Sequence, residues 1–194
     1  MDKKIGTRLS GSYFFYSFIP HPQPLSNWRG ECDLIYIKKY FMTKVLMVCL
    51  GNICRSPLAE SILRQKTKEL NLDIIIDSAG TIGNHINQHP DSRTISNAKK
   101  HGIDISKLKG RQFQVSDFDK FDIIFVMDSS NYSDVMAMAR TEKDKNKVEL
   151  ILNRVYPDSN MAIPDPYYGG EQGFENVYKL LDKACSVIVE SLAS

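Results

Sequence analysis

The chain has 194 residues, 42% of them hydrophobic, and its 25 Lys and Arg residues against 23 Asp and Glu residues give a net charge of +2. This length suits one domain with a sizeable core. The near balance of charge argues against a nucleic-acid-binding surface, and the lack of any run of about 18 apolar residues argues against a membrane span.

The first 41 residues differ in composition from the rest of the chain. They carry six Lys and Arg residues against three Asp and Glu residues, whereas residues 42–194 carry nineteen against twenty. An aromatic cluster at 13–18 precedes Pro20, Pro22 and Pro24, which interrupt regular secondary structure. We therefore expect residues 1–41 to be an N-terminal extension, either disordered or the product of a start codon assigned too far upstream. Residues 42–194 should form the folded domain.

From residue 44 onward, strand and helix patterns alternate. Apolar and β-branched runs predict strands at 45–49, 73–78, 122–127 and 148–152. Apolar residues at helical spacing predict helices at 57–70, 92–101 and 173–192, and one more ending near Met138. This alternation predicts an α/β fold, a three-layer sandwich around a four-stranded parallel sheet. The loop after the first strand would then lie at the carboxyl edge of the sheet, where such folds bind ligands.

That loop carries the most informative motif, CLGNICRSP at residues 49–57. Five residues separate Cys49 from Arg55, a spacing that lets successive backbone amides converge on one anion. Arg55 can add a planar fork of donors that matches two phosphate oxygens. In such a field the thiolate of Cys49 is favoured, which makes it a candidate nucleophile. Ser56 and Pro57 are typical of a helix N-cap and first helical position.

The motif resembles the signature loop of the low-molecular-weight protein tyrosine phosphatases. A second matching motif, DPYYG, occupies residues 165–169, and the segments 77–81 (DSAGT) and 126–128 (VMD) are also similar to family segments. The resemblance covers residues 42–194. It implies a phosphate-binding loop that follows the nucleophile, made of Leu50, Gly51, Asn52, Ile53, Cys54, Arg55 and Ser56.

The resemblance implies hydrolysis of phosphotyrosine through a phosphocysteine on Cys49, with Arg55 binding the phosphate and Asp165 acting as general acid and then base. It also implies supporting roles for six residues. Ser56 would stabilise the thiolate, Ser78 would hold the loop in shape together with Asn52, and Cys54 would be a redox partner of the nucleophile. The rings of Tyr167 and Tyr168 would form a wall for the substrate.

The expected partners are phosphotyrosine-containing proteins, a tyrosine kinase among the candidates, with inorganic phosphate as product inhibitor. The four cysteines, Cys32, Cys49, Cys54 and Cys185, show neither a disulfide framework nor a zinc-site spacing, and the histidines are scattered. We therefore expect no metal and no other cofactor. Because a free thiolate needs a reducing compartment, a cytoplasmic location is expected.

Two positions depart from the family pattern, and two alternative activities stay open. Lys107 follows a segment where many relatives carry a histidine bonded into the loop network, and Asn84 stands where relatives often have an aromatic residue. Protein-arginine phosphatase is one alternative, although Ile53 occupies the position where those relatives tend to carry threonine. Thioredoxin-coupled arsenate reductase is a weaker alternative. That activity needs resolving cysteines well downstream of the nucleophile, and this chain has none between Cys54 and Cys185.

Overall fold

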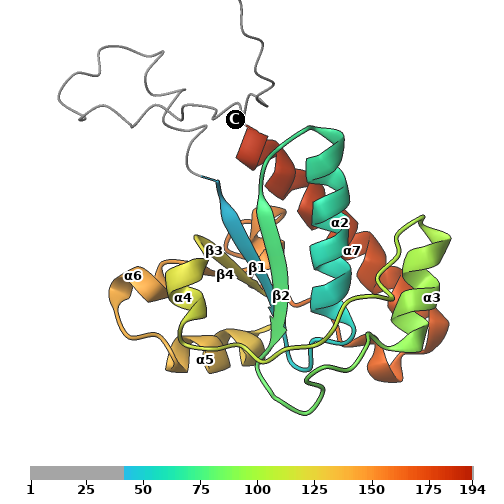
Figure 1. Ribbon diagram of the computed structural model, residues 1–194, viewed down its shortest axis with the longest axis horizontal. Helices are drawn as coiled ribbons and strands as arrows, with labels where there is room; N and C mark the ends of the chain where they lie inside the picture. Colours follow the sequence, from blue (N-terminus) through green and yellow to red (C-terminus); the bar gives the residue numbers. More distant parts are fainter. Residues whose placement is uncertain (1–41, 194) are drawn as a thin grey trace, which may run out of the picture. The chain divides into compact units, whose positions relative to one another are not determined.

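The computed structural model describes residues 42–193, and the predictions for residues 1–41 fall outside that range. Its four strands form one parallel sheet in the order β2-β1-β3-β4 (Figure 1). The strands are β1 (Lys44–Cys49), β2 (Ile75–Gly80), β3 (Ile123–Val126) and β4 (Val148–Leu150). Because β1 is central, the loop that follows it opens at the middle of the carboxyl edge.

Helices cover both faces of this sheet, as Figure 1 shows. One face packs against α2 (Arg55–Glu69) and α7 (Gly170–Ala193), with α3 (Ser92–Lys100) beside α7. The other face packs against α4 (Asp117–Lys120) and α5 (Ser129–Ala137). The short elements are α6 (Glu142–Lys145) and the 3₁₀ helices η2 (Ile151–Arg154) and η3 (Pro166–Tyr168). The predicted three-layer α/β sandwich is confirmed.

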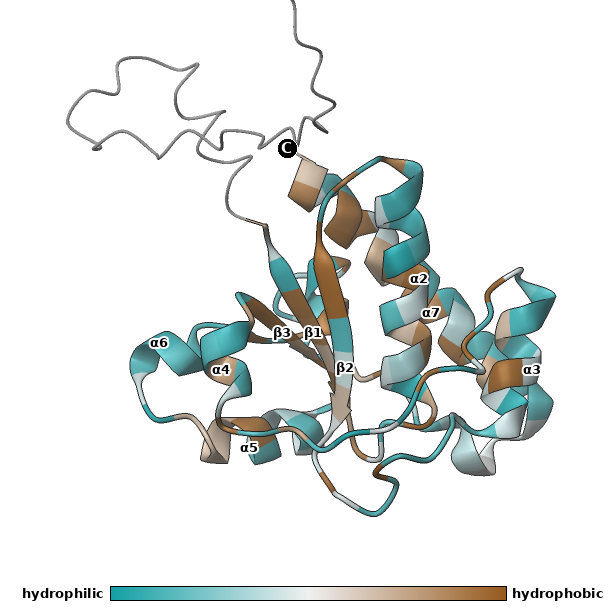
Figure 2. Ribbon diagram, viewed as in Figure 1, coloured by the Kyte–Doolittle hydropathy of each residue, from teal (hydrophilic) through white to brown (hydrophobic). Residues whose placement is uncertain are grey.

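The central strand β1 shows how the sequence produces two cores. Val45 and Met47 point toward α2 and α7, whereas Leu46 and Val48 point toward α4 and α5, and all four are fully buried. Successive side chains of a strand point to opposite faces, so a strand covered on both sides needs an uninterrupted apolar run. Figure 2 shows hydrophobic residues along β1 and β3. Each such side chain stabilises the fold by roughly 1.5–3 kcal/mol.

The start of α2 differs from the prediction. The helix begins at Arg55 with Cys54 as its N-cap, and no side chain caps it, so the assignment of Ser56 as cap and Pro57 as first residue is wrong. The reason is that the Ser56 hydroxyl is engaged elsewhere, by Cys49 and Asn52. The first amides of α2 therefore remain directed at the loop that precedes the helix, which favours anion binding there.

Residues 42–193 contain neither a candidate membrane-spanning helix nor a candidate metal-binding cluster. No helix in that range is long and apolar enough to cross a membrane. No cluster of three or more His, Cys, Asp and Glu residues within it could hold a metal ion.

Candidate active site

A cleft of about 300 Å³ opens at the carboxyl edge of the sheet, above the end of β1. Three segments line it: the loop after β1, the loop after β2 and the segment that precedes α7. The lining residues are Cys49, Leu50, Gly51, Ile53, Cys54, Arg55, Ile82, His85, Asp165 and Tyr167. The cleft thus brings together residues of both sequence motifs, which lie more than a hundred positions apart.

Cys49 ends β1 and is 2% exposed. Its Sγ atom lies 3.0 Å from Oγ of Ser56 and accepts a hydrogen bond from the backbone amide of Asn52 at 3.3 Å. Donors aimed at sulfur stabilise its negative charge, so this environment suits a thiolate.

The loop after Cys49 is held by its carbonyl groups. Those of Cys49, Leu50 and Ile53 accept hydrogen bonds from backbone amides of Thr81, Ile82 and Asp91, at 2.8–3.0 Å. Because the carbonyls are bound to outside segments, successive amides turn toward the centre of the loop, the arrangement of an anion-binding nest. Asn52 contributes to the curl with a left-handed backbone, φ 55°.

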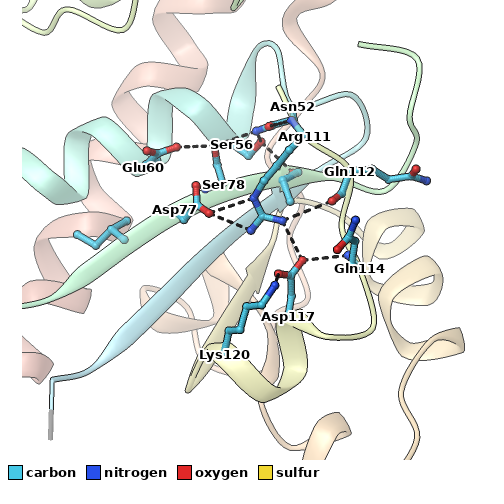
Figure 3. Close-up of polar contacts among 12 residues, drawn as sticks. Asn52, Ser56, Glu60, Asp77, Ser78, Arg111, Gln112, Gln114, Asp117 and Lys120 are labelled. Carbon is cyan, nitrogen blue, oxygen red and sulfur yellow. Dashed lines mark hydrogen bonds and ion pairs between the residues drawn. The ribbon is translucent and has the colours of Figure 1, made fainter. Parts of the chain in front are cut away.

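A chain of buried polar side chains supports the loop (Figure 3). The Asn52 amide donates to Oγ of Ser56 at 2.9 Å and to Oγ of Ser78 at 2.8 Å. Ser78 in turn donates to the carboxylate of Glu60 on α2 at 2.5 Å. Burial raises the pKa of Glu60, while the Ser78 hydrogen bond opposes that rise. Ser78 thus joins Asn52 to Glu60, a residue for which no role was predicted.

Arg111 fixes the remaining oxygen of Asn52. The backbone amide of Arg111 donates to Oδ1 of Asn52 at 2.9 Å, and its guanidinium binds Asp77 and the buried Asp117 (Figure 3). All donors and acceptors of the Asn52 side chain are thereby engaged. No pattern in the sequence predicts this contact, because Arg111 lies outside any regular element.

Arg55 is 3% exposed, and its guanidinium contacts residues of two other segments of the chain. Its Nη1 donates to Asp128 at 2.6 Å and to the carbonyl of Ile163 at 3.1 Å, and its Nη2 lies 3.4 Å from Asp165. Burial opposes the charge, but the neighbouring Cys49 and the carboxylates outweigh it and raise the pKa of Arg55. Within residues 42–193, Nε–H and one Nη2–H have no partner, and together they form the fork that fits two phosphate oxygens.

Asp128 was noted only as part of a family-like segment, without a role. It follows β3, the strand next to β1, and also accepts a hydrogen bond from the backbone of Asn131 as N-cap of α5. The sequence signal that could have indicated Asp128 is its place just after the predicted strand 122–127, as a carboxylate at the carboxyl edge of the sheet.

Asp165 precedes η3 and lines the cleft. Its side chain is 44% exposed, with one oxygen near Arg55 and the other accepting the Tyr167 amide at 3.0 Å. Tyr167 lines the cleft and is 45% exposed. The prediction for Tyr168 concerns a side chain that lies outside the described part of the structure.

The segment after β2 supplies residues that the sequence analysis missed. Ile82 and His85 line the cleft, whereas Asn84 is exposed and does not. At Gly80, which ends β2, a Cβ atom would lie 2.8 Å from the carbonyl oxygen of Leu50, so a larger residue would displace the loop. Lys107 is exposed and does not line the cleft.

The two remaining described cysteines are buried. Cys54 lines the cleft, and burial raises the pKa of its thiol to about 12. Cys185 lies in the core on α7, and burial likewise raises its pKa. At neutral pH both are thiols, so neither competes with Cys49 as a nucleophile.

Comparison with known proteins identifies the family. The family model for low molecular weight phosphotyrosine protein phosphatase matches residues 44–194. The human low molecular weight phosphotyrosine protein phosphatase is 42% identical over 149 residues, covering 75% of this chain and 93% of the human protein. The crystal structure of a protein tyrosine phosphatase from Entamoeba histolytica, with Hepes in its active site, is 37% identical with a TM-score of 0.73, covering 78% of this chain and 97% of its own.

A Drosophila arginine phosphatase of known structure is 34% identical with a TM-score of 0.73, covering 78% of this chain and 99% of its own. The family model and the human relative are nevertheless both described as phosphotyrosine protein phosphatases, which agrees with the family resemblance of the motifs at 49–57 and 165–169. The chain therefore belongs to the low molecular weight phosphotyrosine protein phosphatases, a family of hydrolases that act on phosphoproteins.

Proposed function

We propose that this phosphatase hydrolyses phosphotyrosine through a phosphocysteine on Cys49, with Arg55 binding the phosphate and Asp165 as general acid and base. The observation that carries the proposal is the convergence on one cleft of three groups: a sulfur that accepts from the Asn52 amide and lies 3.0 Å from the Ser56 hydroxyl, a buried guanidinium, and the carboxyl group of Asp165.

In the first step, the Cys49 thiolate attacks phosphorus and the bond to the aryl oxygen breaks. Asp165 gives its proton to the departing phenolate, while the loop amides and Arg55 hold the charge on the phosphoryl oxygens. In the second step, Asp165 takes a proton from water as that water attacks phosphorus. The S–P bond breaks, inorganic phosphate leaves, and the thiolate is restored.

The neighbouring residues have supporting roles in this proposal. Ser56 donates to the thiolate as it is released, and Asn52 with Ser78 keeps the loop amides convergent. Tyr167 and Tyr168 are proposed to receive the substrate ring, and Tyr167 lines the cleft, as do His85 and Ile82. The apolar and aromatic walls match an aryl group, whereas the polar floor matches a phosphate dianion.

The natural substrates would be phosphotyrosine-containing proteins, with a tyrosine kinase as one candidate, and inorganic phosphate would inhibit as product. We place the reaction in the cytoplasm, since the proposed mechanism needs a reduced Cys49.

Arginine phosphatase is the second candidate, favoured by the likeness to the Drosophila enzyme. Against it, the loop carries Ile53, whose apolar side chain lines the cleft where an aryl ring would pass. We expect the purified full chain to prefer a phosphotyrosine peptide over the matched phosphoarginine peptide by at least about tenfold in kcat/KM. Phosphate release from the two peptides measures this ratio.

Equal or greater activity on the phosphoarginine peptide would reverse the assignment. The variant Ile53→Thr serves as the matched control, because it should shift the ratio toward phosphoarginine without reducing phosphate binding.

Mild peroxide should inactivate the enzyme reversibly, through a disulfide between Cys49 and Cys54. Peroxide converts the Cys49 thiolate to a sulfenic acid, and the Cys54 sulfur then displaces water from it. Because burial raises the pKa of Cys54 to about 12, its reactive thiolate is a minor species at neutral pH. The rate of the disulfide-forming step should therefore rise by up to about tenfold for each unit of increase in pH.

Mass spectrometry of peptides after oxidation, with and without added thiol, measures both the disulfide and its reversal. The disulfide should also protect Cys49 from irreversible oxidation. If Cys49 proceeds to the sulfonic acid as readily in the wild type as in Cys54→Ala, Cys54 has no such role.

A further inference from the structure

Arg93, the second residue of α3, contacts the segment that carries Asp165 in three ways. Its Nη1 donates to the carbonyl oxygen of Tyr167 at 2.8 Å. Its guanidinium carbon lies 4.8 Å from the centroid of the Tyr167 ring and 4.9 Å from that of Phe174 on α7. The cation thus packs against two rings while it bonds the backbone next to one of them.

The same guanidinium is oriented from behind by Asp91. Nε donates to one carboxylate oxygen of Asp91 at 3.0 Å, and Nη2 to the other at 2.7 Å, in the two-bond geometry that fixes the plane of an arginine. The Asp91 side chain is 13% exposed, and it also caps α3 by accepting the amide of Arg93. The direction in which Arg93 points is therefore set by the start of the helix.

Asp91 in turn is bonded to the phosphate-binding loop. Its backbone amide donates to the carbonyl oxygen of Ile53 at 2.8 Å. A continuous path of contacts then runs from Ile53 through Asp91 and Arg93 to Tyr167. Tyr167 donates its own amide to Asp165 at 3.0 Å, so the path ends at the carboxyl group of the proposed acid.

The Asp165 segment has little regular structure of its own. Asp165 precedes η3, which is three residues long, and Gly170, which begins α7, has a left-handed backbone with φ 63°. A short 3₁₀ turn does not set the direction of a side chain as firmly as a long helix does. The contact from Arg93 supplies an outside reference that ties this turn to the loop holding the nucleophile.

We propose that Arg93 is a positioning residue for proton transfer: it joins the two loops that meet at the leaving group, and so orients Asp165 and the Tyr167 ring. The proposal rests on the proposed role of Asp165. It implies that the loss of Arg93 affects the reaction through the acid and not through the nucleophile or the phosphate site.

The test is the dependence of kcat on the basicity of the leaving group, measured with a series of aryl phosphates on the full chain. Arg93→Met keeps the length and the packing on the rings but removes the guanidinium. It should lower kcat by at least about tenfold for a basic phenol and by less than about threefold for an activated one. Arg93→Lys keeps the charge without the planar fork, so its kcat for a basic phenol should lie between those of the wild type and Arg93→Met.

Arg154→Met is the matched control. Arg154 also bonds a carboxylate, that of Glu149, and its guanidinium carbon lies 5.4 Å from the ring centroid of Phe125, but neither of these partners lines the cleft, as Tyr167 does for Arg93. This variant should leave the leaving-group dependence unchanged. In a background of Asp165→Ala, Arg93→Met should add no further dependence, because two residues acting through one group do not add.

Failures of the two proposals can be distinguished. If Asp165→Ala itself loses the same factor on every substrate, the acid assignment falls and the role of Arg93 falls with it. If Asp165→Ala is strongly selective while Arg93→Met loses equally on all substrates, or loses nothing, then only the inference about Arg93 is overturned. Should Arg93→Met fail to fold, Arg93→Lys provides the same comparison.

Discussion

Cys49→Ser should abolish turnover while the protein still binds phosphate. The hydroxyl of serine is a far weaker nucleophile than a thiolate, so we expect kcat to fall by at least about 10³-fold. Phosphate binding should survive because it depends on the loop amides and on Arg55, whose partners Asp128 and Ile163 are not altered. Steady-state hydrolysis of an aryl phosphate and calorimetric titration with inorganic phosphate measure the two properties.

Cys185→Ala is the control for this experiment. It removes a buried thiol from α7, outside the cleft, and should retain turnover. Activity of Cys49→Ser above about a few per cent of the wild type would show that the nucleophile is another group.

Asp165→Ala should slow the hydrolysis of poor leaving groups far more than that of activated ones. A basic phenolate needs a proton in the transition state, and a positioned acid contributes about 10²–10⁴-fold, whereas an activated phenolate leaves without one. The ratio of kcat values for the two kinds of aryl phosphate measures this effect.

Asp165→Asn separates the chemical role from the structural one. Its amide oxygen can still accept the Tyr167 amide, which keeps the turn, but it has no proton to transfer. We expect it to behave like Asp165→Ala on poor leaving groups. If the asparagine variant restores their hydrolysis, Asp165 acts only in folding.

The strands and long helices could be predicted because their signals are local. The run 45–49 is apolar at every position, which is what a strand covered on both faces requires, and β1 occupies that place. The helix predicted at 92–101 corresponds to α3, and Gly102, two positions after α3 ends, has a left-handed backbone with φ 76° that suits a helix end. The helices α4 and α6 were not predicted, since four residues are too few to show a period.

The strand β2 illustrates a limit of local patterns. It was expected at 73–78 but runs from Ile75 to Gly80, two residues later. Its position is set by the register with β1, in which Lys44 pairs with Ile75 and Cys49 with Gly80. The apolar run alone does not contain that information.

The residues of the candidate site likewise comprise some that a local pattern indicates and others that only tertiary contacts bring in. The loop residues Cys49, Asn52, Arg55 and Ser56 could be proposed from the sequence because they lie in one short segment with a recognisable pattern. Glu60, Asp128 and Arg111 reach that segment through tertiary contacts with partners 18 to 73 positions away. Their residue types are common on protein surfaces, so only the fold distinguishes them.

The direct test of the covalent mechanism is to locate the phosphoryl group during turnover. The full chain would be mixed with an isotopically labelled aryl phosphate, denatured within the first turnover, and digested for peptide mass spectrometry. We predict one phosphoryl group per protein, attached to Cys49 and formed before inorganic phosphate is released. A phosphoryl group on another cleft residue such as His85, or phosphate release without any labelled protein, would contradict the mechanism.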